Sequence, residues 1–193
     1  VLNDNIFNIA VEGNFDDCQN IVKDLFIDEE TQNKTSLTAV NSINWARLIA
    51  QTVYYFWAYL QLEQQQVSFI VPSGNFGNIF SARIAKHMGL PINQLHVATN
   101  QNDTLHQIIS SGNMTRKMVE QTYSPSMDIQ VSSNFERQIF ESVKNDSDEV
   151  KKVMQDFKIN HKYSFDPNVV QHIQNIYHST AVSNEMTLDT IKI

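Results

Sequence analysis

One stretch constrains the fold more than any other: an apolar run that leads into a turn with two glycines and then into a segment of helical spacing. The apolar run is Val67–Pro72, and the turn after it reads Ser73-Gly-Asn-Phe-Gly-Asn78. Apolar side chains then recur at helical spacing until Gly89 and Pro91. The pattern predicts a buried strand that turns sharply into a helix. A second strand, predicted at Leu95–Thr99, completes a strand–helix–strand unit, so we expect an α/β fold with a parallel sheet flanked by helices.

This turn has the features of an anion-binding site. Where a strand turns sharply into a helix, unpaired backbone N–H groups and the positive end of the helix dipole converge, and phosphate is the usual ligand. Gly74 and Gly77 would let the backbone approach a ligand closely, and Ser73, Asn75 and Asn78 would add side-chain donors. The turn lacks the Lys-Ser/Thr pair of a P-loop and the glycine spacing of a dinucleotide fingerprint. The sequence leaves open an ordinary turn, whose glycines only satisfy backbone angles.

A second informative stretch is the apolar and aromatic segment that runs to Leu60. Its apolar residues cover nearly every face of a helix, so we expect a central, buried helix with Ser42 as its N-cap. Arg47 lies near the start of this helix, and no acidic residue lies close to it in sequence. Because an unpaired buried charge is costly, Arg47 needs an anionic partner. That partner is either a distant carboxylate or a bound anion, and Asn41 with Ser42 would serve a phosphate well.

The N-terminal residues predict a strand, a helix and a connection. Ile6–Val11 is predicted as a short strand, and Asn14 as the N-cap of the helix that follows. Asp16 and Asp17 suit the positive end of the helix dipole. Adjacent residues diverge by about 100° around a helix, which makes them a poor metal or acid–base pair. The polar segment 28–34 is the predicted surface connection and the best candidate for a domain boundary.

A polar loop and further helices are predicted after the second strand. Asn100–Thr104 lies at the C-terminal end of that strand, where α/β proteins place ligands. A helix over Leu105–Ser111 should end at Gly112. The segment 114–129 is expected to be irregular, and Asn134 is expected to cap another helix.

The composition argues against several classes of protein. A formal net charge of −7 and the lack of a basic cluster argue against nucleic-acid binding. The longest apolar segment is too polar and interrupted for a membrane span. Cys18 is the one cysteine, which rules out an internal disulfide and fits a reducing compartment, and the six histidines lack metal-ligand spacing. At 193 residues the chain suits one or two domains, and because it does not begin with Met we expect it to begin inside a longer protein.

Five motifs, in their order along the chain, resemble those of one enzyme family. They are Val11-Glu-Gly-Asn-Phe-Asp-Asp-Cys18, Asn41-Ser-Ile-Asn-Trp-Ala-Arg47, Ser73-Gly-Asn-Phe-Gly-Asn78, Ala98-Thr-Asn-Gln-Asn-Asp-Thr104, and Pro125-Ser-Met-Asp-Ile129 with Ser132-Ser-Asn-Phe-Glu-Arg137. In this combination the chain resembles threonine synthases of the bacterial and fungal type, which are pyridoxal-phosphate enzymes of the tryptophan-synthase-β fold (fold type II). The resemblance runs from about Ile6 through Arg137 and continues more weakly to the end.

The resemblance implies a function and assigns roles to residues. The family converts O-phosphohomoserine and water to threonine and phosphate, the last step of threonine biosynthesis, with pyridoxal 5′-phosphate as the electron sink. By the resemblance, the cofactor phosphate would be held by Ser73, Gly74, Asn75, Phe76, Gly77 and Asn78, and the substrate phosphate by Asn41, Ser42 and Arg47. Residues 1–30 would be the end of the smaller α/β domain and residues 31–193 most of the larger one. The enzyme would be cytoplasmic, and its oligomeric state stays open.

Two elements of the family pattern have no counterpart in the chain. The family's lysine that binds the cofactor covalently lies upstream in a Phe-Lys-Asp-type segment, and Lys23, Lys34 and Lys86 do not match that context. The Asp-Pro-His-Thr-type segment that contacts the pyridine ring is also missing, and Asp166-Pro-Asn-Val is not a convincing counterpart. We therefore expect an internal piece of the enzyme, without a catalytic residue of its own and inactive alone. Two alternatives stay open: another enzyme of this fold, such as a serine or threonine dehydratase, and a non-catalytic module that binds a phosphate ligand.

Overall fold

The structure is a computed structural model that describes residues 3–41 and 43–192. The chain divides into two compact units, Val1–Thr38 and Ala39–Ile193. Within the described residues, no helix has the length and apolar character needed to cross a membrane. In the same part of the chain, no group of three or more His, Cys, Asp or Glu side chains is placed to hold a metal ion.

The first unit contains two helices that follow an irregular N-terminal segment. α1 (Phe15–Ile27) begins at Asn14, whose side chain accepts hydrogen bonds from the backbone N–H groups of Asp16 and Asp17. The Asp17 carboxylate accepts a hydrogen bond from the Asn14 N–H in return, at 2.8 Å. This capping box confirms the prediction that Asn14 begins a helix. α2 (Glu29–Lys34) occupies the polar segment, and none of its residues is buried.

The prediction of a strand at Ile6–Val11 is wrong. These residues have no regular secondary structure, and Phe7 and Ile9 are 82% and 83% exposed. A strand needs a neighbour that pairs its N–H and C=O groups, and the described part of the first unit supplies no such strand. An apolar run alone therefore does not make a strand here.

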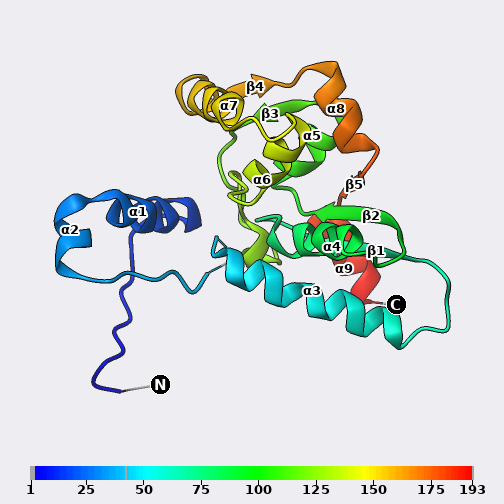
Figure 1. Cartoon of the computed structure of the whole chain (residues 1–193), viewed down its shortest axis with the longest axis horizontal. Coiled ribbons are helices and arrows are strands. Elements are labelled where there is room, and N and C mark those ends of the chain that lie inside the picture. Colours follow the sequence, from blue (N-terminus) through cyan, green and yellow to red (C-terminus); the bar gives the residue numbers. More distant parts are fainter. Residues whose placement is uncertain (1–2, 42, 193) are drawn as a thin grey trace. The chain divides into compact units, whose positions relative to one another are not determined.

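The second unit is built on a three-stranded parallel sheet (Figure 1). Its strands are β1 (Val67–Pro72), β2 (Ile92–Thr99) and β5 (Tyr177–Ala181), in the order β1-β2-β5. α4 (Gly77–His87) connects β1 to β2, so the predicted strand–helix–strand unit and parallel sheet are confirmed. Two short strands, β3 (Asn113–Thr115) and β4 (Lys162–Ser164), form a separate antiparallel pair.

The other helices of this unit are α3 (Trp45–Leu60), α5 (Thr104–Ser111), α6 (Phe135–Ser142), α7 (Ser147–Asn160), α8 (Pro167–Gln174) and α9 (Asn184–Ile191), with a 3-10 turn, η1 (Pro125–Met127). α5 ends as predicted: Gly112 is left-handed (φ 74°), and its N–H donates to the Ile108 carbonyl. The segment expected to be irregular contains β3 and η1, which are too short to leave a pattern in the sequence.

One face of the sheet is buried and the opposite face is exposed. Val71, Val97 and Tyr177 lie on the buried face, and the Tyr177 hydroxyl donates to Gln138 Oε1 of α6 at 2.8 Å. On the opposite face Ile70 is 72% exposed. The prediction of a buried β1 therefore holds only for alternate residues of the strand.

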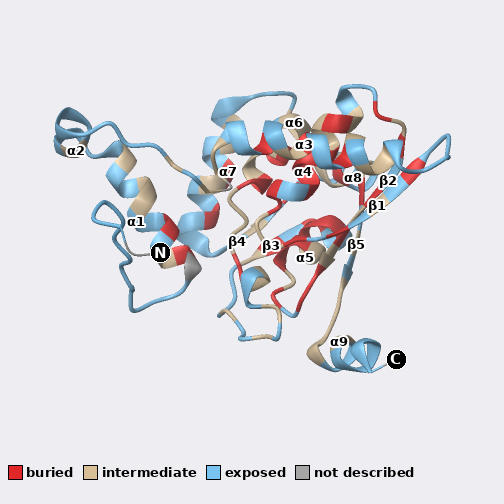
Figure 2. Cartoon of the chain, turned by 90° about the horizontal axis from the view of Figure 1, so that it is seen from below, coloured by how far each residue is buried: buried red, intermediate tan, exposed pale blue. Residues whose placement is uncertain are grey.

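The prediction that α3 is central and buried is wrong. Only Leu48, Thr52 and Tyr55 of this helix are buried, whereas Val53 and Trp57 are 61% and 64% exposed. Figure 2 shows the burial class along each element. α3 packs with one side along α4, and a helix that is apolar all round needs neighbours on its other sides as well. The helix also begins later than predicted, after Asn44, and the expected N-cap Ser42 lies outside the described residues.

Candidate phosphate-binding site

The turn between β1 and α4 leaves a group of backbone donors unpaired. Phe76 precedes the helix in the left-handed conformation (φ 63°), and no side chain caps the start of α4. The backbone N–H groups of Gly74, Phe76, Gly77 and Asn78 make no hydrogen bond to any described residue. Because the first N–H groups of a helix have no partner within the helix, side chains, water or a ligand must satisfy them. A helix start without a capping side chain is suited to an anion.

The Phe76 side chain anchors this turn in the core. It is 1% exposed and packs edge-on against Phe135 of α6 and Tyr177 of β5, with ring centroids 5.0 and 5.2 Å apart. A bulky residue in the left-handed region carries backbone strain, which persists only where surrounding contacts fix it. Aromatic burial supplies those contacts here, so the backbone of the turn is held in one conformation.

Gly74 lies against the backbone of a distant segment. A Cβ atom at Gly74 would lie 3.0 Å from Met127 Cα and 3.1 Å from the Met127 carbonyl oxygen. These distances are shorter than an ordinary van der Waals contact, and a backbone neighbour cannot yield as a flexible side chain can. Only glycine therefore lets the turn pack this closely on the segment around Met127.

The residues after Met127 hold the turn through Asn75. The backbone N–H and the hydroxyl of Ser133 donate to Asn75 Oδ1 at 2.9 and 2.6 Å. Asn134 Nδ2 donates to the Asn75 carbonyl oxygen at 3.2 Å. Asn134 occupies the N-cap position of α6, as predicted, but its side chain makes no capping hydrogen bond. The side chain binds the glycine turn instead.

The polar loop after β2 anchors this same segment. Asp128 Oδ1 accepts hydrogen bonds from Asn100 Nδ2 at 2.7 Å, Asn102 Nδ2 at 3.1 Å and Thr122 Oγ1 at 2.7 Å. Asn100 and Asn102 are 7% and 3% exposed. The loop was expected at a ligand-binding edge of the sheet, and its amides instead fix the segment that packs on Gly74.

Asn78 is oriented by a residue of α3. The Tyr55 hydroxyl donates to Asn78 Oδ1 at 2.7 Å and lies 3.0 Å from the Asn78 carbonyl oxygen. Burial raises the pKa of the Tyr55 phenol well above its usual value, so the group stays a neutral donor. With its oxygen bound to Tyr55, the exposed Asn78 side chain keeps its NH2 group as the donor for a ligand.

The start of α3 presents a cation without an acidic partner. The Arg47 side chain is exposed, so the prediction that it is a buried charge in need of an anionic partner is wrong. Its Nη1 donates to the Val40 carbonyl at 3.1 Å. No described carboxylate forms an ion pair with Arg47, so the distant carboxylate considered from the sequence is not found within the described residues. Asn41 Oδ1 accepts a hydrogen bond from the Ile43 N–H at 3.1 Å, which leaves its NH2 group as a donor. Ser42 lies outside the described residues.

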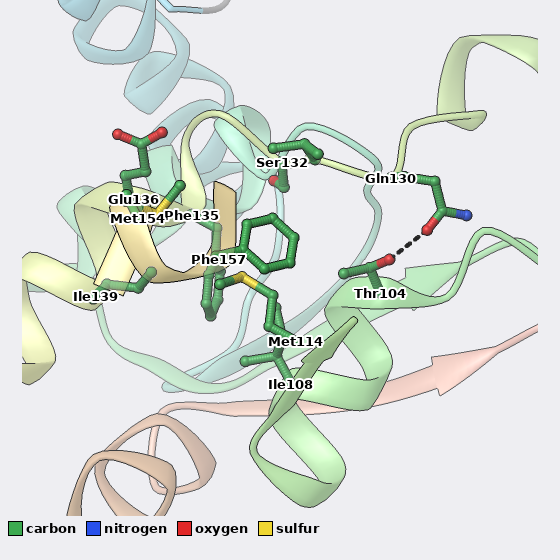
Figure 3. A pocket seen from close by; sticks show the side chains of 11 residues that line it. Thr104, Ile108, Met114, Gln130, Ser132, Phe135, Glu136, Ile139, Met154 and Phe157 are labelled. Carbon is green, nitrogen blue, oxygen red and sulfur yellow. Dashed lines mark hydrogen bonds between the residues drawn. The ribbon is translucent and has the colours of Figure 1, made fainter. Parts of the chain in front are cut away.

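A small cavity elsewhere in the second unit does not compete with the turn as a cofactor site. It is lined by residues of α5, α6 and α7, among them Thr104, Ile108 and Phe135 (Figure 3). Its volume of about 10 Å³ admits roughly one water molecule. Ser132 lines this cavity, and its buried hydroxyl has no hydrogen-bond partner among the described residues, a need that one water would meet.

The contribution of several residues to the shape of the turn was not predicted from the sequence. Four residues contact the turn or the start of α3, either directly or through one another: Tyr55, Ser133, Asn134 and Arg137. Asn134 and its neighbours lie in one of the five motifs, which is the signal that could have marked them. Tyr55 left no signal, because an aromatic residue within an apolar helix is normally part of the core.

A glycine turn that leads from a parallel strand into an uncapped helix is the arrangement in which α/β proteins commonly bind phosphate. Over nearly all of its length the chain is similar to threonine synthases. It is 48% identical to threonine synthase of Pseudomonas aeruginosa over 193 residues, which cover 99% of this chain and 41% of the relative. It is 43% identical to the Saccharomyces cerevisiae enzyme over 206 residues, which cover 100% of this chain and 40% of the relative. No family model matches the chain.

Solved structures of the family share the fold. The crystal structure of PLP-bound threonine synthase from Brucella melitensis aligns with a TM-score of 0.83 and 45% identity over 93% of this chain and 39% of that chain. The yeast threonine synthase structure aligns with a TM-score of 0.81 and 42% identity, over 93% of this chain and 38% of that chain. The chain thus spans about two fifths of the length of the curated relatives it matches.

Proposed function

We propose that this chain supplies the phosphate-binding elements of a threonine synthase, which converts O-phosphohomoserine and water to threonine and phosphate with pyridoxal 5′-phosphate. The observation that carries the proposal is the start of α4, where a glycine turn leaves backbone donors unpaired and uncapped. The family relationship adds the enzyme and the small-molecule substrate.

The cofactor phosphate would be held by the turn that comprises Ser73, Gly74, Asn75, Phe76, Gly77 and Asn78. Three observations support this fit: the unpaired N–H groups, the absence of a side-chain cap, and a glycine at position 74 with no room for a Cβ atom. When bound, pyridoxal phosphate supplies the electron sink for the reaction. The residues of this chain bind its phosphate and fix its orientation, with Phe76 anchoring the turn and Asn78 donating an N–H.

The substrate phosphate would be held by Asn41, Ser42 and Arg47. In support, Arg47 is exposed and has no carboxylate partner among the described residues, and Asn41 keeps its NH2 group as a donor. A guanidinium and an amide at the start of a helix are suited to a phosphate. Ser42 belongs to this proposal by the resemblance alone.

The remaining parts of the proposal rest on the family. The lysine that binds the cofactor would come from outside these residues, so no catalytic residue is assigned within the chain. Residues 1–30 would be the end of the smaller domain, and residues 31–193 most of the larger one. A cytoplasmic enzyme fits the single cysteine, which argues for a reducing compartment.

Replacing Arg47 tests the proposal in the full-length protein that contains this chain. Arg47→Gln removes the charge that would bind the substrate phosphate, so kcat/KM for O-phosphohomoserine should fall about a hundredfold, which corresponds to the loss of a charge-assisted contact. The visible absorbance of bound cofactor should persist. Arg116→Gln, at an exposed arginine directly after β3, is the matched control and should leave kcat/KM unchanged.

Two results would contradict the proposal. A serine or threonine dehydratase of the same fold carries no phosphate on its substrate, so its turnover should barely respond to Arg47→Gln. A full-length protein that stays colourless with added pyridoxal phosphate would exclude the whole class.

A further inference from the structure

Asn134 connects the glycine turn to a second region of the molecule. Its side chain is 0% exposed, and both ends of its amide are used. Nδ2 donates to the Asn75 carbonyl in the turn at 3.2 Å, and Oδ1 accepts from Arg137 Nε at 3.2 Å. A buried amide that leaves its own helix uncapped to bind two other groups stabilises their relative position.

Arg137 extends this connection to the start of α3. Its Nη2 donates to the Ile43 carbonyl at 2.9 Å, and its Cζ lies 5.1 Å from the centroid of the Trp45 ring. No salt bridge joins Arg137 to a carboxylate within the described residues, although the charge of Glu136 acts on it. Burial lowers the pKa of Arg137 and the charge of Glu136 partly offsets this, but a guanidinium remains charged at neutral pH. Its geometry is therefore set by an amide oxygen, a carbonyl and an aromatic ring.

The connection depends on the shape of the guanidinium as well as on its charge. A planar fork donates to Asn134 and Ile43 at the same time, from two different nitrogens. Lysine carries the same charge as a single point on a flexible stem and cannot bridge two acceptors in fixed directions. A substitution that keeps the charge but removes the fork thus separates the two properties.

We propose that Asn134 and Arg137 are positioning residues that fix the start of α3 against the glycine turn, and so set where the substrate phosphate binds relative to the cofactor phosphate. The inference rests on the proposed function, since it assigns one phosphate to each end of the link. Neither side chain needs to touch a ligand. Misplacing bound groups by about 1 Å can reduce catalysis about a hundredfold, so a link of this kind matters for the reaction.

The test uses Arg137→Lys in the full-length protein, with Arg83→Lys as the matched control. Arg83, in α4, is also partly buried, and its Nε bonds Glu141 Oε2 of α6 at 3.3 Å rather than a group of the glycine turn or of the start of α3. Arg137→Lys should raise KM for O-phosphohomoserine about tenfold, or about 1.4 kcal/mol, with a smaller change in kcat. The absorbance of bound cofactor should stay, and Arg83→Lys should not raise KM.

A second readout needs no cofactor. The N–H groups of Asn44 and Arg47 bond the carbonyls of Asn41 and Asn44, both at 3.1 Å, at the start of α3. In cofactor-free protein, Arg137→Lys should speed hydrogen exchange at these amides about tenfold, because the Ile43 carbonyl is no longer held. Arg83→Lys should leave their exchange unchanged.

A second variant breaks the link at its other end. Asn134→Asp can still accept from Arg137 but cannot donate to the Asn75 carbonyl, so it should raise KM in the same way even if Arg137→Lys fails to fold. The double variant should be no worse than the more severe single one, as expected for residues of one network.

If the wild type is active and both Arg137→Lys and Asn134→Asp keep its KM, the inference alone is overturned. The same holds if Arg83→Lys raises KM as much as they do. A wild type that binds no cofactor, or does not turn over O-phosphohomoserine, would overturn the proposed function and the inference with it.

Discussion

The two helices that start at the candidate phosphate sites begin in different ways. α4 starts at a left-handed Phe76 without any side-chain cap, and its first residues are largely buried. α3 starts at Asn44, whose Oδ1 accepts from the Ala46 N–H at 2.9 Å, and its first residue, Trp45, is 48% exposed. The start of α4 leaves its first backbone N–H groups unpaired among the described residues, whereas the start of α3 satisfies one of its N–H groups with the side chain of Asn44.

Under the proposed function, this difference would give two ways of binding a phosphate. At α4 the donors would be backbone N–H groups held by a packed core, so affinity would depend on the shape of the turn. At α3 the donors would be the side chains of Asn41 and Arg47, so affinity would depend on charge. A turn built from backbone suits a cofactor that stays bound, and flexible side chains suit a substrate that must enter and leave.

The largest expected effect comes from the anchor of the α4 turn. Phe76→Ala removes a ring that is 1% exposed, so the free energy of unfolding of the full-length protein should fall by about 3–5 kcal/mol. Trp45→Ala, the matched change at the start of α3, removes a half-exposed ring and should cost at most about 2 kcal/mol. Chemical denaturation of both variants measures the difference, and equal losses would show that the two starts are packed alike.

The next largest effect comes from a change in the shape of the turn that leaves Phe76 in place. Gly74→Ala places a Cβ atom 3.0 Å from Met127 Cα, so the turn or the segment must move, and cofactor affinity should fall at least tenfold, or about 1.4 kcal/mol. Gly89→Ala is the control: no atom lies within 4 Å, and its positive φ of 102° costs only backbone strain. Titration with pyridoxal phosphate at its visible absorbance reports the affinities. An unchanged affinity in Gly74→Ala would contradict a site built on the turn.

A smaller effect isolates the cap of α3. Asn44→Ala removes the acceptor for the Ala46 N–H and the donor to the Ala39 carbonyl, and should lower stability by about 1 kcal/mol. Asn14→Ala removes a cap of the same type from α1 and should cost a similar amount. Only Asn44→Ala should also raise KM for O-phosphohomoserine, because it loosens the segment that carries Asn41 and Arg47. Thermal unfolding measures the loss of stability, and steady-state kinetics measures the rise in KM. A KM rise in both variants would show that the effect on the site does not come from the cap of α3.

The sequence predicted the α4 turn better than its surroundings for a physical reason. Strand, glycine turn and helix are encoded within 25 neighbouring residues or so, and local pattern is enough to find them. The strand at Ile6–Val11 and the buried α3 were predicted wrongly because both depend on neighbours that a local pattern cannot supply. The same holds for the site: the role of Asn134 could not be seen from the sequence, because its side chain binds Asn75 from 59 residues away. Its type and position suggested a cap, and tertiary contact overrode that preference.

The smallest expected effect separates the two ways of binding in a single experiment. Inorganic phosphate added to cofactor-free protein at a concentration equal to its Kd should add about 0.4 kcal/mol of stability for each site it fills. In Gly74→Ala the part contributed by the turn should disappear, and in Arg47→Gln the part contributed by the start of α3. Added sodium chloride should reduce the stabilisation by phosphate bound at Arg47 more than that by phosphate bound at the turn. An exposed side-chain charge is screened by salt, whereas buried backbone dipoles are screened far less. Thermal unfolding across a series of phosphate concentrations measures the stability gained from phosphate by each of the two variants at each of two salt concentrations. Identical salt dependence in both variants would mean that charge dominates at both helix starts, and that the contrast between them is one of packing alone.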